Sequence, residues 1–261
     1  MGIVNVTDDS FSGDGLKGDP AAAIAQARAQ VAAGADLIDL GAESTRPGAQ
    51  PVSAEQEIAR LLPVLEGLQD LGVPIAVDTR RSTVMRAAAM AGAAILNDIT
   101  ALEGEGNLAA AAESGLPVIL MHMQGEPGTM QQAPHYEDVV AEVYDYLARR
   151  IAACEAAGIP RAKIVVDPGF GFGKTLQHNI ALMRGLQRFH DLGCAVLVGV
   201  SRKSMIGGLT GEAAPARRVP GSLAAALWAV EKGGAQIIRV HDVAETVQAL
   251  KVWQGLSQEL Y

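Results

Sequence analysis

The sequence predicts an α/β fold built on one parallel sheet, and three observations support this. Short apolar runs alternate with helical patterns eight times along the 261 residues. The runs are apolar throughout, as is typical of parallel strands covered on both faces. Several end in a polar residue, as expected where strand ends share one face. We therefore expect a single (β/α)₈ (TIM) barrel with its active site at the C-terminal ends of the strands; an open doubly wound sheet is the alternative.

The first half of the chain is predicted to form four strand and helix pairs. Strands are expected at residues 2–6, 36–40, 74–77 and 94–96, and helices at residues 19–33, 53–72, 82–91 and 107–114. The first helix is alanine-rich and is followed by Gly34. Ser53 and Gln56 have the spacing of a capping box, and Gly72 and Gly92 mark the ends of the next two helices.

The second half continues the alternation. Strands are expected at residues 118–121, 164–166, 195–200 and 236–240, and helices at residues 136–157, 176–191, 220–232 and 243–256. The connection at 122–134 is long and rich in Gly, Pro, Gln and Met, which predicts a working loop. No change in composition indicates a boundary, so we expect one domain over residues 1–261.

Composition excludes several classes of function. The net charge of −8 argues against a nucleic-acid partner, because neutralising phosphates needs a basic face. Cys154 and Cys194 are the only cysteines, which leaves no disulfide framework and favours a reducing cytoplasm. No apolar run reaches the roughly 18 residues that a membrane helix needs, so no membrane partner is expected.

The segment 165–175, VVDPGFGFGKT, shows the polar strand end most clearly. A β-branched run ends in Asp167, and Pro168 then stops the strand. The segment resembles a phosphate-binding P-loop, but that motif needs glycine where Pro168 stands, and the glycines also miss the dinucleotide spacing. We expect this loop to form a pocket wall.

Two residues near the end of the chain suit an anion. Arg239 and His241 lie two apart on the last expected strand, so their side chains leave the same face. Asn5 on the adjacent first strand adds a neutral oxygen ligand. The three suit a diphosphate with its magnesium, which takes few protein ligands and several phosphate oxygens. Solvated charges at a strand end are the alternative.

A second set of polar residues suits a flat heterocycle. It consists of two carboxylates, an amide and a cation at four strand ends: Asp78, Asn97, Asp167 and Lys203. A carboxylate accepts two parallel N–H donors of an amidine-like edge, while a lysine serves a carbonyl. The ring of Phe172 and the guanidinium of Arg239 can stack on its faces. Ion pairs between strand ends are the alternative.

Eight segments carry a resemblance to a known family. They are MGIVNVTDDSFS (1–12), GAESTRPGA (41–49), VDTRR (77–81), NDI (97–99), LMHMQG (120–125), DPGFGFGK (167–174), SRKSMIG (201–207) and RVHD (239–242). In this order they resemble the dihydropteroate synthases of folate biosynthesis. The resemblance implies a (β/α)₈ barrel transferase that condenses 6-hydroxymethyl-7,8-dihydropterin diphosphate with p-aminobenzoate. Diphosphate would leave by a dissociative route.

The resemblance also implies a role for each matching residue. The pterin would be bound by Asp78, Asn97, Ile99, Met121, Asp167, Phe172, Lys203 and Arg239. The diphosphate, with Mg²⁺ on Asn5, would be held by Asn5, Thr45, Arg239 and His241. The p-aminobenzoate subsite, where sulfonamides would compete, would contain Phe11, Thr45, Arg46, Pro47, Lys203 and Ser204. Catalysis would depend on Asn5, Asp78, Asp167, Lys203, Arg239 and His241. The resemblance also implies that the chain forms a homodimer.

The first loop departs from the family pattern at two places. Asp8 stands where the family usually has proline, and residues 13–15 read Gly-Asp-Gly where the family has Asp-Gly-Gly. Altered sulfonamide susceptibility is therefore a hypothesis. Two other functions remain open: a pterin-dependent methyltransferase, which needs no diphosphate clamp, and a catalytically silent pterin-binding protein.

Overall fold

The sheet of this protein contains eight parallel strands in sequence order. The computed structural model describes residues 1–7, 19–44 and 52–257, and in it each strand pairs with the next one along the chain. The strands are β1 (Gly2–Asn5), β2 (Ile38–Gly41), β3 (Ile75–Asp78), β4 (Ile95–Asp98), β5 (Val118–Met121), β6 (Ile164–Asp167), β7 (Ala195–Val198) and β8 (Ile237–Ile238). This order differs from that of a doubly wound sheet, which reverses at a switch point. The predicted α/β class with a parallel sheet is confirmed.

The first and last strands of the sheet lie next to each other. Gly2 forms a parallel bridge with Val240. The N–H of Ile3 donates to the carbonyl of Val240 at 3.0 Å, and the N–H of Val240 donates to the carbonyl of Met1 at 2.9 Å. The sheet is therefore curled, and its first strand shares backbone hydrogen bonds with Val240, two residues beyond β8.

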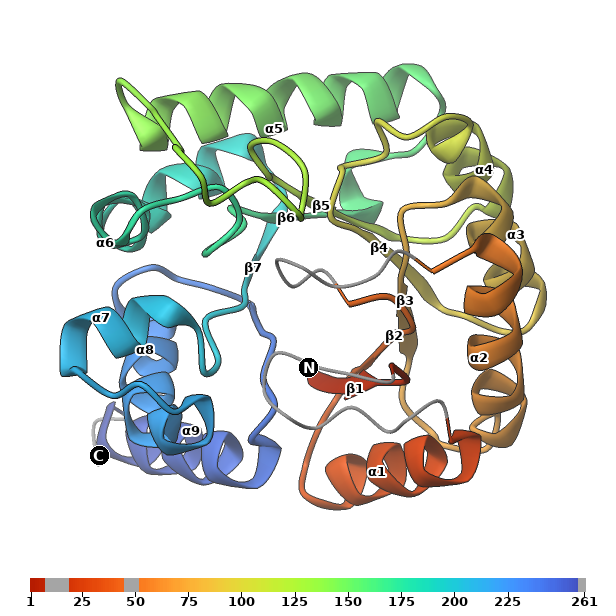
Figure 1. Cartoon of the computed structure of the whole chain (residues 1–261), viewed down its shortest axis with the longest axis horizontal. Helices are drawn as coiled ribbons and strands as arrows, with labels where there is room; N and C mark the ends of the chain where they lie inside the picture. Colours follow the sequence, from red (N-terminus) through yellow and green to blue (C-terminus); the bar gives the residue numbers. More distant parts are fainter. Residues whose placement is uncertain (8–18, 45–51, 258–261) are drawn as a thin grey trace.

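The helices form an outer layer around the strands (Figure 1). They are α1 (Pro20–Ala32), α2 (Ala54–Gly67), α3 (Ser82–Met90), α4 (Asn107–Ser114), α5 (Val139–Ala156), α6 (Leu176–Arg184), α7 (Ser204–Thr210), α8 (Val219–Glu231) and α9 (Val243–Ser257). Three 3₁₀ helices accompany them: η1 (Arg161–Lys163), η2 (Leu186–Leu192) and η3 (Pro215–Arg218). Within the described ranges, none of the helices has the length and apolar run that crossing a membrane requires.

The predicted capping box is present at the start of α2. The Ser53 side chain accepts the N–H of Gln56 at 3.2 Å, and the Gln56 side chain accepts the N–H of Ser53 at 3.0 Å. Two backbone N–H groups that the first turn leaves without helical partners are thereby satisfied.

Three stretches differ from the prediction. The second helix ends at Gly67, before the expected Gly72, because the chain turns after Leu68. The helix predicted at 176–191 is instead α6 followed by η2, and a side chain at the intervening Gly185 would press on Val140 of α5. No helix was predicted at 204–218, where α7 and η3 lie. The seven residues of α7, SMIGGLT, are too few and too glycine-rich to show a helical period.

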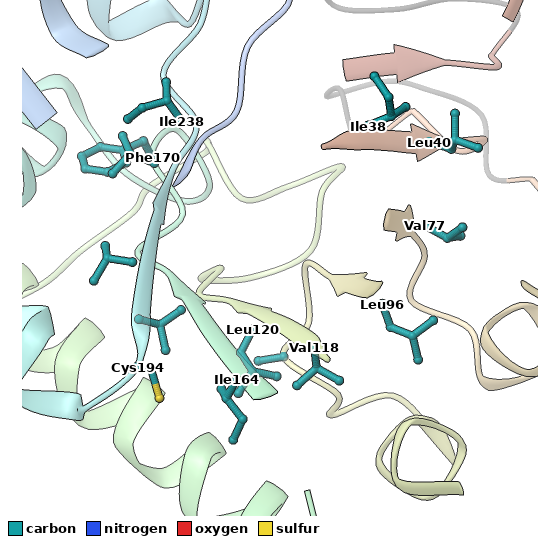
Figure 2. Close-up of a cluster of buried hydrophobic side chains, with 14 of the residues drawn as sticks. Ile38, Leu40, Val77, Leu96, Val118, Leu120, Ile164, Phe170, Cys194 and Ile238 are labelled. Atoms are coloured by element: carbon teal, nitrogen blue, oxygen red, sulfur yellow. The ribbon is translucent and has the colours of Figure 1, made fainter. Parts of the chain in front are cut away.

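Side chains along the strands alternate between two environments. Figure 2 shows one set, buried hydrophobic side chains that pack together: Ile38, Leu40, Val77, Leu96, Val118, Leu120, Ile164, Phe170, Cys194 and Ile238. In β2 to β4, the positions between these core residues hold Asp39, Asp78 and Asn97. Because successive side chains of a strand point to opposite faces, core packing turns the intervening polar residues toward the inside of the curled sheet.

Candidate active site

A cavity of about 350 Å³ lies where these polar side chains meet. All described residues with a predicted site role line it: Asn5, Asp78, Asn97, Ile99, Met121, Asp167, Phe172, Lys203, Ser204, Arg239 and His241. Phe170, Gly171 and Phe172 form part of its wall, as expected for the loop after β6. The predicted residues Phe11, Thr45, Arg46 and Pro47 lie outside the described residues, as do Asp8 and positions 13–15.

Strand register places four of the lining residues in one row. Asn5 pairs with Gly41, Gly41 with Asp78, and Asp78 with Asn97. A Cβ atom at Gly41 would lie 3.7 Å from Asn5 Oδ1 and 3.8 Å from Asp78 Cβ. The glycine therefore leaves room for about one methyl group beside the Asn5 amide and Asp78 Cβ.

Asp39 is a residue of this site that the sequence analysis did not select. It is fully buried in β2, and its Oδ2 lies 2.6 Å from the guanidinium of Arg239. The amide of Asn97 donates to both carboxylate oxygens at 3.3 Å. The guanidinium of Arg239 also reaches Asp78 Oδ2 at 3.3 Å. Arg239 thus contacts two acidic side chains from neighbouring strands.

The Asp78 carboxyl has an unusual proton affinity. Burial and the negative charge of Asp39 together raise its pKa from 3.8 to about 8, while Arg239 opposes the shift. Burial therefore favours the protonated form of Asp78 in the free protein. A ligand that brings N–H donors to this carboxyl would favour its ionised form.

The pKa of Asp78 predicts a pH dependence of folding. Between its ordinary value of 3.8 and about 8, the folded chain keeps a proton that the unfolded chain has released. The free energy of unfolding therefore falls as the pH rises through this window. We expect Asp78→Asn to make that fall shallower, as measured by urea unfolding at pH about 5 and about 7.5. An unchanged difference between the two pH values would contradict this assignment.

Asp167 and Lys203 form the opposite side of the cavity. Asp167 Oδ1 accepts the N–H of Gly169 at 2.7 Å, and Lys203 Nζ donates to the carbonyl of Phe170 at 2.5 Å. Burial raises the pKa of Asp167, and Lys203 opposes this shift. Burial lowers the pKa of Lys203 to about 8, and Asp167 opposes that shift. Lys203 Nζ also lies 4.8 Å from the centre of the Phe172 ring.

Consecutive residues after β7 pair with consecutive residues after β8. Ser201 Oγ lies 2.9 Å from Nδ1 of His241 and accepts its backbone N–H at 3.2 Å. Arg202 forms two hydrogen bonds to Asp242, at 3.0 and 2.5 Å. Arg202 has a left-handed φ of 57°, so the chain reverses here and both Ser201 and Lys203 line the cavity. Ser201, like Asp39, had no predicted site role.

The sequence contains only a weak indication that Asp39 is a site residue. Asp39 is an acid inside the apolar run that forms β2, and a polar residue inside a buried strand needs a partner. The partner, Arg239, lies 200 positions away in the sequence, so only the fold reveals the pair.

A magnesium ion bound mainly by substrate oxygens would fit this cavity. The amide of Asn5 supplies a hard oxygen donor, and the space over Gly41 lies beside it. In the described part of the chain, no group of three or more His, Cys, Asp or Glu side chains is placed to hold a metal ion. The Asn5 oxygen is a donor of the kind that Mg²⁺ accepts when it binds mainly to substrate phosphates and water.

Comparison with known proteins shows which family this chain belongs to. The family model described as "Pterin binding enzyme" matches residues 1–241. The dihydropteroate synthase of Escherichia coli K12 is 53% identical over 253 residues, covering 97% of this chain and 89% of the relative. The chain belongs to the dihydropteroate synthase family. The predicted family resemblance is therefore confirmed, and the members named here are transferases of folate synthesis.

Solved structures of the family share the fold. A dihydropteroate synthase from Yersinia pestis, in complex with a sulfonamide drug, has a TM-score of 0.94 and 47% identity, over 98% of this chain and 92% of that one. The enzyme from Xanthomonas albilineans, in complex with 7,8-dihydropteroate, has a TM-score of 0.86 and 44% identity, over 100% and 93% of the two chains.

Proposed function

We infer that this chain acts as a dihydropteroate synthase, joining 6-hydroxymethyl-7,8-dihydropterin diphosphate to p-aminobenzoate. The observation that carries this function is the meeting of carboxylates, an amide and cations from many strand ends in one cavity. Family membership over nearly the full chain supports the same reaction.

The pterin is proposed to lie between Asp167 and Asp78. Buried carboxylates accept the N–H groups of the amidine-like edge, and Asn97, turned by its bonds to Asp39, offers an amide to the ring. Lys203 exchanges its bond with the Phe170 carbonyl for one with the pterin oxygen. Ile99, Met121 and Phe172 line the slot, where Arg239 stacks on the ring.

The proposed reaction is dissociative. The C–O bond to diphosphate breaks first, and the bonding electrons leave with the diphosphate. Asp167 and Asp78 stabilise the pterin-methylene cation that remains. The amine of p-aminobenzoate then forms the C–N bond and loses a proton. His241, held by Ser201, binds the departing diphosphate together with Arg239.

Asn5 is the proposed protein ligand of the metal, and Thr45 the further contact of the diphosphate. When bound, Mg²⁺ supplies positive charge that offsets the negative charge of the leaving group. The p-aminobenzoate subsite is proposed to contain Phe11, Thr45, Arg46, Pro47, Lys203 and Ser204, and sulfonamides would compete there. Ser204 is the first residue of α7, whose N-terminal N–H groups favour a carboxylate.

The closure of the sheet, the assembly of the chain and its cellular location are also proposals. We propose that the sheet is a closed (β/α)₈ barrel forming one domain over 1–261, supported by the hydrogen bonds between the first strand segment and Val240, just after β8. A homodimer is supported by exposed Trp228 on α8 and Val252 on the adjacent α9. Two free, buried cysteines are consistent with the proposed cytoplasmic location.

Turnover with the two substrates tests this function. Diphosphate release and dihydropteroate formation are expected together in the presence of Mg²⁺, and EDTA should slow both. A sulfonamide should raise the KM for p-aminobenzoate without changing kcat. Pterin binding without either product would indicate a silent binding protein, and methyl transfer without diphosphate release would indicate the methyltransferase.

A further inference from the structure

Lys174, the lysine of the segment that resembles a P-loop, points inward. Only 3% of its surface is exposed. Its Nζ lies 2.9 Å from the carbonyl oxygen of Gly169 and 3.0 Å from that of Phe172. It also lies 2.9 Å from Nδ1 of His122 and 3.4 Å from the His122 carbonyl oxygen. Burial lowers the pKa of Lys174 well below its usual range, and its side-chain nitrogen connects the turn after β6 to the segment after β5.

The glycines of this turn allow close contact with the same segment. Gly169 has a left-handed φ of 71°, and a Cβ atom there would overlap the carbonyl of His122. Gly173 has a φ of 62°, and a Cβ atom there would overlap the carbonyl of Gln124. Two backbones thus pack directly against each other, and Lys174 supplies the hydrogen bonds at their junction.

His122 is built to accept one of these hydrogen bonds. Its ring is buried edge-on against Tyr146, with the ring centres 4.9 Å apart. Burial lowers the pKa of His122 to about 2, and the nearby Lys174 contributes to this shift. A neutral imidazole carries one ring proton, so Nδ1 accepts from Lys174 only when that proton is on Nε2.

On its other side, the turn faces the cavity. Asp167 accepts the N–H of Gly169, and Lys203 donates to the carbonyl of Phe170, both from within the site. When Lys203 moves to a ligand oxygen, its bond to Phe170 is lost. The bonds of Lys174 to Gly169 and Phe172 lie outside the cavity and remain in place.

We propose that Lys174 is a positioning residue, whose bonds to Gly169, Phe172 and His122 hold the 169–173 turn in its pterin-binding shape after Lys203 has turned to the ligand. Phe172 and Asp167 then keep their places on the ring while the reaction proceeds. The proposal rests on the proposed function for the identity of that ring.

Lys174→Met removes the donors but keeps an unbranched side chain only one atom shorter than that of lysine. The KM for the pterin diphosphate and the Kd for 6-hydroxymethylpterin are expected to rise about tenfold, as for loss of one hydrogen bond to a charged group. The KM for p-aminobenzoate should stay within about twofold of wild type. Lys163→Met is the matched control, because Lys163 Nζ donates to a loop carbonyl, Gly115, away from the cavity. It should leave all three constants unchanged.

His122→Phe keeps an aromatic ring and removes the Nδ1 acceptor together with Nε2–H, so it tests the proposal even if Lys174→Met does not fold. We expect a rise of about threefold in the pterin KM, since the carbonyl bonds of Lys174 remain. Circular dichroism and gel filtration identify the folded variants. Equal pterin constants in wild type and a folded Lys174→Met, or a parallel rise in both KM values, would overturn the proposal.

¹⁵N NMR of the imidazole tests the contact without any substrate. The wild type should show His122 neutral with its proton on Nε2, and Lys174→Met should shift the tautomer balance toward Nδ1–H. A proton on Nδ1 in the wild type would overturn the proposal. A wild type that shows the expected tautomer but binds no pterin would refute the proposed function alone.

Discussion

Asp39→Ala is expected to lower the free energy of unfolding by about 3–5 kcal/mol, the usual cost of breaking a buried ion pair. The Asp39 carboxylate is fully buried and lies 2.6 Å from the Arg239 guanidinium. Its removal leaves Arg239 with the 3.3 Å contact to Asp78. The buried positive charge then keeps only the longer of its two contacts with acidic side chains. Urea unfolding at neutral pH measures the loss.

Asp145→Ala is the matched control for this prediction. Asp145 is exposed on α5, away from the cavity, and its replacement should change the free energy of unfolding by less than about 0.5 kcal/mol. Asp39→Asn separates charge from hydrogen bonding, because the amide oxygen still accepts from Arg239. We expect the loss of unfolding free energy for Asp39→Asn to lie between the losses for Asp39→Ala and Asp145→Ala. A loss below about 1 kcal/mol for Asp39→Ala would show that Arg239 finds compensation elsewhere.

Asp167→Asn is expected to lower kcat/KM on the order of 10³-fold, comparable to the removal of a strong transition-state contact. Asparagine retains the oxygen that accepts the Gly169 N–H at 2.7 Å, so the turn after β6 keeps its shape. The negative charge facing the pterin is lost, together with one acceptor for the ring. Steady-state kinetics with both substrates measures the loss, and thermal unfolding establishes that the variant is folded.

The way in which the Asp167→Asn effect divides between kcat and KM tests the dissociative route. A carboxylate that stabilises the cation lowers kcat when neutralised, whereas one that only binds the ground state raises KM. We expect both changes, with kcat carrying the larger share. An effect confined to KM would assign Asp167 to substrate binding alone. A fall in kcat/KM of less than about fivefold would contradict its proposed role in the reaction.

Much of this architecture was predictable because local patterns encode it. Apolar runs fixed the order of strands, and polar residues at their ends indicated one shared face, as the cavity at Asp78, Asp167 and Lys203 bears out. The capping box at Ser53 was readable from four residues. Such features depend on spacing within a short stretch, so they need no knowledge of the fold.

Other features depend on contacts between distant segments. Asp39 lies within a strand, and its function as a partner of Arg239 appears only when β2 and β8 are brought together. The pairing of Ser201 with His241 likewise joins two strand ends that are 40 residues apart. The inward direction of Lys174 depends on the packing of Gly169 against His122. Local sequence gives no measure of such distances.

The alternation of side chains along the strands limits how this protein can evolve. Leu40 packs in the hydrophobic core while Asp39 beside it meets Arg239 on the other face, and the same division runs through Val77 and Asp78. Insertion or deletion of a single residue within such a strand would exchange these two faces. It would place carboxylates in the hydrophobic core and aliphatic side chains in the cavity. Changes in chain length are therefore tolerable only in the connecting loops, and inherited variation within the strands is confined to replacements in place.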